Sequence, residues 1–239
     1  MTDRKTQLAE NLARVEERIS AACAAAGRER DDVTLIVVTK TYPASDVRLL
    51  HELGVRHVAE NRDQDAAPKA AACADLDLTW HFVGQLQTNK VRSVASYAHV
   101  VQSVDRLKLV GALSSAAERA GRELGCLVQV ALDAEAGERG DRGGVAPDGI
   151  GELADAVAAA PGLRLDGLMT VAPLAGPYAG RERAAFDRLM EFSSRLRAAH
   201  PTANMVSAGM SADLEHAVAA GATHVRIGTA VLGDRPRLG

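Results

Sequence analysis

Eight short apolar runs recur along this chain, and each is followed by a segment with the periodicity of an amphipathic helix. Strands that alternate with helices form a parallel sheet, because each helix carries the chain back to the edge where the next strand begins. The runs that we predict as strands are 35–40, 57–60, 80–83, 99–102, 127–132, 163–169, 204–206 and 223–227. Eight such units in a chain of 239 residues fit a (β/α)8 barrel, the TIM barrel of the α/β class. An open doubly wound sheet is the alternative.

One further helix precedes the first strand. Over residues 3–26 the apolar side chains fall on one helical stripe, formed by Leu8, Leu12, Val15, Ile19 and Cys23. Among the later helices, those predicted with both ends cover 87–97, 147–160, 180–200 and 211–220. No linker or low-complexity tract interrupts the alternation, so residues 1–239 are predicted to form a single domain.

Composition excludes several classes of partner and compartment. The net charge of −3 gives no reason to expect nucleic acid or an anionic membrane surface. No run of 18 apolar residues is present, and the N-terminus is charged and has no apolar signal core, so we expect neither a membrane span nor export. The three cysteines are far apart and form no zinc pattern, which is typical of a reducing cytoplasm. We find no Walker loop, dinucleotide fingerprint or metal-ligand motif, and we expect no metal.

Lys40 ends the first predicted strand, just before Thr41, Tyr42 and Pro43. The carboxyl ends of barrel strands are where such folds place their active sites. A lysine that is partly shielded from water can lose its proton and attack a carbonyl group as a free amine. The alternative, and on position alone the commoner role, is a solvated lysine that closes a strand.

Two loops with small residues follow the seventh and eighth strands, where barrels often hold phosphate. They read SAGMS, from Ser207 to Ser211, and GTA, from Gly228 to Ala230. Glycine lets the backbone approach a ligand closely, and free N–H groups at a helix start favour an anion. The alternative is that Ser211 and Thr229 are ordinary helix N-caps.

Arg226 shares one face of the eighth strand with Gly228, because strand side chains alternate. If Val225 and Ile227 face the helices, Arg226 points into the barrel, where a guanidinium group requires an acceptor. A bound anion or a ring nitrogen would serve, and an ion pair with a barrel carboxylate is the alternative. Asn61 follows the second strand and is either a site residue or a helix N-cap. His81 lies in the third strand, and we interpret it as a hydrogen-bonded core histidine.

Six stretches of the chain resemble one family in the expected order. They are VTKTYP (38–43), AEN (59–61), WHFVGQLQTNK (80–90), GLM (167–169), GMS (209–211) and VRIGTA (225–230). On these stretches the chain resembles the YggS/PROSC family, the pyridoxal phosphate homeostasis proteins. The resemblance implies an alanine-racemase-like barrel that holds pyridoxal 5′-phosphate (PLP) as a Schiff base on Lys40.

The resemblance also implies the other site residues. Asn61 would lie beside the cofactor, and Arg226 would face its pyridine nitrogen, which weakens the ring as an electron sink. The phosphate would be held by Ser207, Gly209, Met210, Ser211, Gly228 and Thr229. The chain departs from the family at Arg142, where a lysine is frequent. We expect the surrounding segment 138–144 to be a solvated mobile loop.

Three functions are compatible with a Schiff-base lysine in a barrel. The resemblance favours a carrier of PLP without robust turnover. A PLP-dependent amino-acid racemase is the alternative, but racemisation requires a second acid/base opposite the lysine, which barrel racemases take from an added β-domain that we do not find here. Of Tyr42, Tyr97 and Tyr178, only Tyr42 is near Lys40. A class I aldolase is the third possibility. We expect PLP, amino acids and PLP-dependent apo-enzymes as partners, and a monomer.

Overall fold

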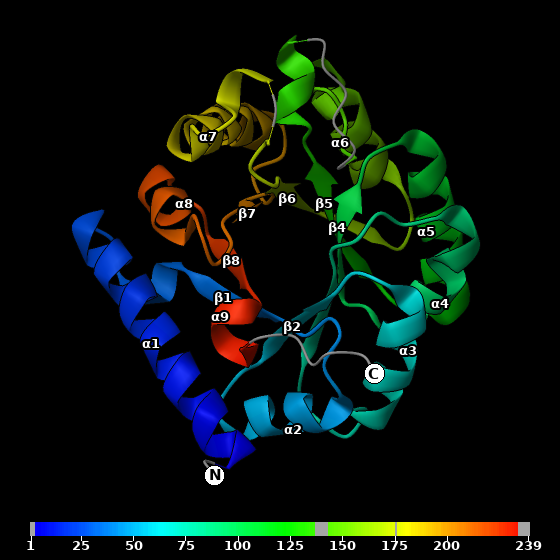
Figure 1. Ribbon diagram of the computed structural model, residues 1–239. Coiled ribbons are helices and arrows are strands. Elements are labelled where there is room, and N and C mark those ends of the chain that lie inside the picture. Colours follow the sequence, from blue (N-terminus) through cyan, green and yellow to red (C-terminus); the bar gives the residue numbers. More distant parts are fainter. Residues whose placement is uncertain (1–2, 137–142, 175, 234–239) are drawn as a thin grey trace.

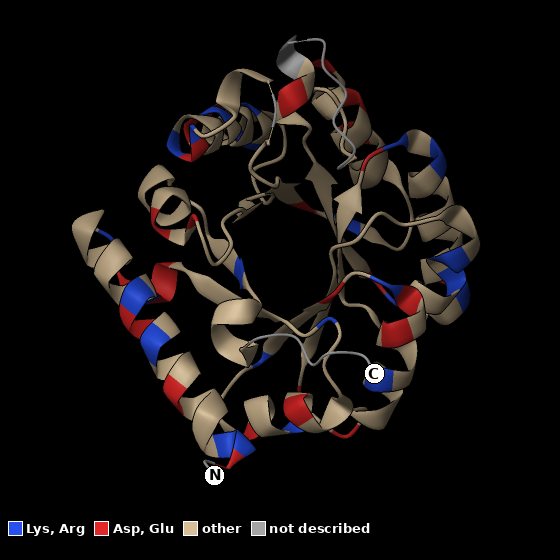
Figure 2. Cartoon of the chain, in the orientation of Figure 1, with Lys and Arg blue, Asp and Glu red and all other residues tan. Residues whose placement is uncertain are grey.

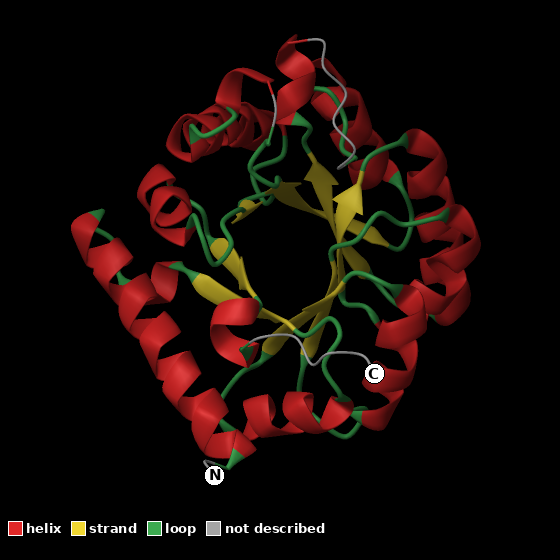
Figure 3. Cartoon of the chain, viewed as in Figure 1, coloured by secondary structure: helices red, strands yellow, loops and turns green. Residues whose placement is uncertain are grey.

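The computed structural model describes residues 3–136, 143–174 and 176–233. Its eight parallel strands close into a barrel in chain order, with β8 paired to β1. The strands are β1 (Thr34–Val38), β2 (His57–Glu60), β3 (Thr79–Phe82), β4 (Val100–Val104), β5 (Leu124–Gln129), β6 (Leu163–Met169), β7 (Met205–Ser207) and β8 (His224–Ile227). The predicted TIM barrel is therefore confirmed, and the open sheet is wrong. Figures 1 and 3 show the strands as a central ring inside the helices.

The helices that surround the barrel follow the predicted alternation. They are α1 (Arg4–Ala25), α2 (Ala44–Glu52), α3 (Asp63–Ala72), α4 (Val91–Tyr97), α5 (Leu107–Ala120), α6 (Ile150–Ala159), α7 (Glu182–Ala199), α8 (Leu214–Ala220) and α9 (Thr229–Leu232). Two predicted helices, 87–97 and 147–160, each begin instead with a 3₁₀ turn, Thr88–Lys90 and Pro147–Gly149. In the described part of the chain, no helix has both the length and the apolar character of a membrane span.

The leading helix α1 lies outside the ring and packs against α2, α8 and α9 (Figure 1). Its predicted stripe is the buried face, except that Leu12 is only partly buried. Burying a leucine, isoleucine or valine stabilises the fold by about 1.5–3 kcal/mol. This stripe therefore fixes α1 across the start and the end of the barrel, next to the loops that follow β1 and β8.

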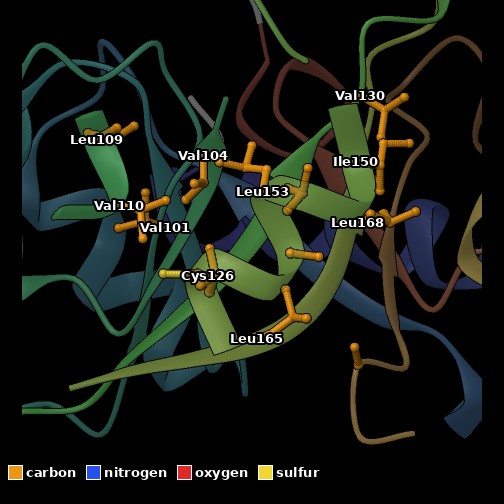
Figure 4. Packing of buried hydrophobic residues seen from close by; sticks show 14 of the residues in the cluster. Val101, Val104, Leu109, Val110, Cys126, Val130, Ile150, Leu153, Leu165 and Leu168 are labelled. Carbon is orange, nitrogen blue, oxygen red and sulfur yellow. The ribbon is translucent and has the colours of Figure 1, made fainter. Parts of the chain in front are cut away.

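Apolar side chains form an outer layer between strands and helices and a smaller cluster inside the barrel. Figure 4 shows part of the outer layer, where side chains of β4, β5 and β6 meet those of α5 and α6. The inner cluster consists of Ile36, Ala59, Val100, Leu127, Met169 and Met205. Figure 2 shows that most charged residues lie on the helices. Polar groups inside the barrel are therefore conspicuous, and they belong to the site described next.

Candidate functional site

The residues singled out from the sequence follow four strands that are neighbours in the barrel. The closed order places β7 beside β8, β8 beside β1 and β1 beside β2. Because all strands are parallel, their carboxyl ends meet at one end of the barrel. Lys40, Asn61 and the two loops at 207–211 and 228–230 are therefore brought to one edge.

Lys40 lies in a turn, whereas the sequence predicted it as the last residue of the strand, because β1 ends at Val38. Its side chain is partly buried. The next residue, Thr41, has a φ of 71°, a left-handed conformation that β-branched residues rarely adopt. The Tyr42 N–H closes the turn by donating to the Thr39 carbonyl at 3.1 Å. Backbone strain that its surroundings hold in place clusters at functional sites.

A buried ion pair lies behind this turn, between the ends of β1 and β2 and helix α3. The Lys69 ammonium contacts the Glu60 carboxylate and also donates to the Thr39 carbonyl at 2.8 Å. The Thr39 hydroxyl donates to the same Glu60 oxygen, Oε1, at 2.6 Å. The second oxygen, Oε2, is buried and has no hydrogen-bond partner among the described residues. Burial raises the pKa of Glu60, although the charge of Lys69 and the two hydrogen bonds oppose that shift.

Asn61 is partly buried directly after β2 and lines a small pocket of 190 Å³. The N-cap of α3 is Arg62, so the alternative interpretation of Asn61 as a helix cap is wrong. Gly84 packs against its main chain, since a Cβ atom on Gly84 would lie 2.0 Å from the Asn61 carbonyl oxygen. Only glycine at position 84 allows β2 and the loop after β3 to approach this closely.

The loop after β7 requires glycine at position 209. Its φ is 92°, and a Cβ atom would lie 2.6 Å from the Cβ of Ala217 in α8. The Gly209 carbonyl accepts from the Arg226 N–H at 2.9 Å. This bond ties the loop to β8, so the two candidate phosphate loops lie side by side.

Helix α8 begins later than predicted. It starts at Leu214 with Asp213 at the N-cap, and the Asp213 carboxylate accepts from the Met210 N–H at 2.5 Å. Ser211 therefore lies in the preceding turn, and the alternative interpretation that its side chain caps the helix is wrong. Met210 is 36% exposed and Ser211 is partly buried, so both lie at the open side of the loop.

The turn after β8 leads directly into α9. Gly228 is the N-cap and Thr229 the first helical residue, so the threonine side chain is not a cap either. A Cβ atom on Gly228 would lie 3.3 Å from the Val38 carbonyl oxygen, which shows how closely the ends of β8 and β1 meet. Thr229 is exposed. The position of α9 is fixed by α1, because the Asn11 amide donates to the Val231 carbonyl at 2.9 Å.

Arg226 points into the barrel, as predicted, and is only 4% exposed. Its guanidinium group donates to the Ser207 hydroxyl at 2.7 Å and to the Thr170 carbonyl at 2.8 Å. Among the described residues it makes no ion pair, so the alternative of a paired barrel carboxylate is not observed. Burial lowers its pKa to about 10, against the opposing charge of Asp213, which leaves it cationic at neutral pH.

Ser207 connects Arg226 to further polar groups inside the barrel. Its buried hydroxyl donates to the Gln102 side chain at 2.7 Å, and Gln102 in turn bonds to His81 at 3.0 Å. His81 also bonds to His57 at 3.1 Å, so the interpretation of a hydrogen-bonded core histidine is confirmed. Burial and nearby positive groups hold the pKa of His81 well below its usual range. Ser207 thus uses its side chain to contact Arg226 and is less open to a phosphate than Ser211.

Sequence reasoning missed Glu60, Lys69 and Gln102. Alternation along β4 could have found Gln102, since it shares the inner face with Val100. Nothing in the spacing of Glu60 and Lys69 shows that they pair. The segment expected to be a mobile loop lies outside the described residues, except for Gly143 and Gly144. Within the described residues, no three His, Cys, Asp or Glu side chains are grouped so that they could hold a metal ion.

The chain is similar to several known proteins along nearly its whole length. The family model of the alanine racemase N-terminal domain matches residues 10–236. A pyridoxal phosphate homeostasis protein of Pseudomonas aeruginosa is 43% identical over 95% of this chain and 96% of its own length. A pyridoxal phosphate homeostasis protein of Mycobacterium tuberculosis is 41% identical over 98% of this chain and 95% of its own length. The structure of PipY from Synechococcus elongatus with PLP bound has a TM-score of 0.79 at 33% identity, covering 95% of this chain and 100% of PipY.

The fold and the arrangement of the site define an alanine-racemase-like barrel. The chain belongs to the pyridoxal phosphate homeostasis protein family.

Proposed function

We propose that this protein binds PLP covalently through Lys40 and keeps it available inside the cell without catalytic turnover. The observation that carries the proposal is the convergence of Lys40, Arg226 and two glycine-containing loops on neighbouring strand ends. The names of the relatives and the PLP-bound PipY structure support it.

The residues present fit the cofactor. Lys40 would form the covalent bond with its aldehyde, and Asn61 would lie beside it. The backbone of both glycine loops, at Ser207, Gly209, Met210 and Gly228, and the hydroxyl groups of Ser211 and Thr229 would hold the phosphate. Arg226 would face the pyridine nitrogen. Two observations are the structural reasons for this assignment: the Arg226 guanidinium is buried and makes no ion pair among the described residues, and the Arg226 N–H ties the loop after β7 to β8 through the Gly209 carbonyl.

Arg226 also argues against strong catalysis. PLP, when bound, supplies an electron sink whose strength depends on protonation of the ring nitrogen. With a pKa of about 10, Arg226 keeps its proton at neutral pH and can donate only a hydrogen bond to that nitrogen. The ring nitrogen would therefore stay unprotonated, which disfavours carbanion chemistry.

Among the described residues, the two side chains considered as a second acid/base for a racemase, Tyr42 and His81, already have hydrogen-bond partners. The Tyr42 hydroxyl donates to the Gly233 carbonyl at 2.7 Å. His81 is engaged on both ring nitrogens, by His57 and Gln102. Neither side chain is poised to deliver a proton to a substrate carbon opposite Lys40.

Borohydride reduction followed by peptide mapping tests the covalent site. The reduced cofactor is expected on Lys40, and Lys40→Ala should not give that adduct. Lys108→Ala, which removes an exposed lysine of α5, should behave as wild type. A main adduct on Lys69 or Lys90 would contradict the assignment.

Deuterium exchange at Cα separates carrier from racemase. With alanine or serine in heavy water, we expect a spectral change without catalytic racemisation. Racemisation at about 1 s⁻¹ or faster, lost in Lys40→Ala, would establish an enzyme.

The same proposal includes four statements about the protein in the cell. It acts in the cytoplasm as a monomer and as a single domain over residues 1–239, and it exchanges PLP with PLP-dependent apo-enzymes. Light scattering after gel filtration tests the monomer. Reactivation of an apo-transaminase by the loaded protein, compared with free PLP, tests the exchange.

A further inference from the structure

A continuous chain of hydrogen bonds crosses the inside of the barrel from β8 to β2. It runs from Arg226 to Ser207 at 2.7 Å and from Ser207 to Gln102 at 2.7 Å. It continues from Gln102 to His81 at 3.0 Å and from His81 to His57 at 3.1 Å. Five side chains from five strands therefore form one connected polar path beside the apolar cluster inside the barrel.

With the Gln102 amide oriented as in the structure, every bond in this path has one direction, starting from Arg226, which can only donate. The Ser207 oxygen accepts from Arg226, and its hydroxyl group donates to Oε1 of Gln102. The Gln102 amide nitrogen is then turned toward His81, whose Nδ1 must be an unprotonated acceptor. His81 consequently carries its proton on Nε2 and donates to Nδ1 of His57.

The direction of these bonds determines the orientation of the Ser207 hydroxyl group. A serine hydroxyl rotates freely unless an acceptor holds its hydrogen, and in another rotamer it would turn that hydrogen toward the guanidinium group. Oε1 of Gln102 is the acceptor that prevents this rotation. Gln102 in turn has one orientation because His81 accepts from its amide group. A neutral His81 therefore maintains a lone pair of Ser207 in front of Arg226.

The structure holds the Arg226 guanidinium group at two points. The path ends on a single cation. The Ser207 hydroxyl of the path and the Thr170 carbonyl, which lies outside the path, accept from separate nitrogens of the same guanidinium group. Two bonds to different nitrogens fix both the position and the plane of the group.

We propose that Gln102 and His81 are positioning residues that hold the Arg226 guanidinium in one orientation through Ser207. The proposal rests on the proposed function, because the ring that Arg226 would meet is that of PLP. Neither Gln102 nor His81 is required to touch the cofactor.

Gln102→Leu tests the proposal, since leucine fills similar space and cannot bond to Ser207 or His81. Ser103→Ala is the matched control, because Ser103 is the next residue of β4 and its buried hydroxyl has no hydrogen-bond partner among the described residues. Ser207→Ala and the double variant Gln102→Leu/Ser207→Ala complete a cycle. If Gln102 acts through Ser207, the double variant should show no larger effect than Ser207→Ala alone.

The first measurement uses the cofactor-free protein. Nitrogen-15 NMR should show His81 as the Nε2–H tautomer and the Arg226 Nη hydrogens as separate signals, in wild type and in Ser103→Ala. In Gln102→Leu the Arg226 signals should merge, because the group rotates. A wild-type His81 protonated on Nδ1, or unchanged Arg226 signals in Gln102→Leu, would overturn the proposal whether or not the protein binds PLP.

The second measurement uses the loaded protein. Gln102→Leu should weaken PLP binding on the order of tenfold and shift its absorption band, as expected when a hydrogen bond from a charged group is lost. Ser103→Ala should change neither property. A Gln102→Leu protein that melts at lower temperature but binds PLP with wild-type affinity and spectrum would contradict the proposal, because the path would then only stabilise the fold. A wild type that binds no PLP would instead refute the proposed function.

Discussion

The ammonium group of Lys69 lies 2.8 Å from the carbonyl oxygen of Thr39, the residue that precedes Lys40. The same carbonyl accepts from the Tyr42 N–H at 3.1 Å. Two donors, the Lys69 ammonium and the Tyr42 N–H, thus converge on the carbonyl directly before Lys40. Because Lys69 and Glu60 are both buried, this support depends on a charge pair in a medium where a lone charge is costly.

Lys69→Met should destabilise the protein strongly, because it leaves the Glu60 carboxylate buried without its counter-charge. Removing one partner of a buried pair costs about 3–5 kcal/mol of unfolding free energy. Urea unfolding measures the change. Lys108→Met, at an exposed position of α5, should change the unfolding free energy by less than about 0.5 kcal/mol.

A second variant separates lost charge from lost packing. Glu60→Leu/Lys69→Met replaces both charges with apolar groups and should recover much of the stability, as buried pairs often do. If the double variant were as unstable as Lys69→Met alone, the charge imbalance would not be the cause.

Gly84→Ala should disturb the site through the backbone. The added methyl group would lie 2.0 Å from the Asn61 carbonyl oxygen, so the β2 end or the loop after β3 has to move. We expect a lower melting temperature and weaker PLP binding together. Gly111→Ala in α5 is the control, because nothing lies within 4 Å of its Cβ and alanine favours helices. Unchanged PLP affinity in Gly84→Ala would show that Asn61 is not held by this contact.

The sequence predicts the barrel well because one period of alternation is repeated eight times, and a local error in one unit does not alter the pattern. Some strand ends shift by one to three residues, and the largest shift is at β5, where the apolar run used for the prediction continues past Gln129 into the loop. Arg226 could be oriented from strand alternation alone. The sequence could not show whether Ser211 and Thr229 are helix N-caps. The N-caps are Asp213 and Gly228, and tertiary contacts determine where these two helices begin. Pairs such as Glu60 and Lys69 depend on how α3 is seated, which no local pattern encodes.

Ser211→Ala/Thr229→Ala should weaken PLP binding with little loss of stability. Neither side chain caps a helix, so the usual cost of about 1 kcal/mol for a lost cap does not apply. Each lost hydrogen bond to a charged phosphate should reduce the binding free energy by about 1.5–3 kcal/mol. Spectroscopic titration with PLP and thermal melting measure the two effects. Ser115→Ala, exposed on α5, is the control, and a double variant that melts lower but binds normally would exclude these hydroxyls from the site.

Acid should destabilise the protein between about pH 6.5 and pH 4 through its buried histidines. Burial, assisted by the neighbouring His57, lowers the pKa of His224 from 6.5 to about 4. Above pH 6.5 this side chain is neutral in both the folded and the unfolded protein. As the pH falls, the unfolded chain binds a proton that the folded protein does not, so stability is lost until the pH reaches the folded pKa, below which the loss levels off.

For His224 alone, that loss amounts to at most on the order of 3 kcal/mol. His224→Asn, which retains a polar group near the Thr223 hydroxyl, should therefore flatten the dependence of the unfolding free energy on pH within this window. Urea unfolding at pH 7, 6, 5 and 4 measures the slope. His216→Asn, at an exposed position of α8, is the matched control and should retain the wild-type slope. An identical slope in His224→Asn and wild type would mean that folding does not lower the pKa of His224.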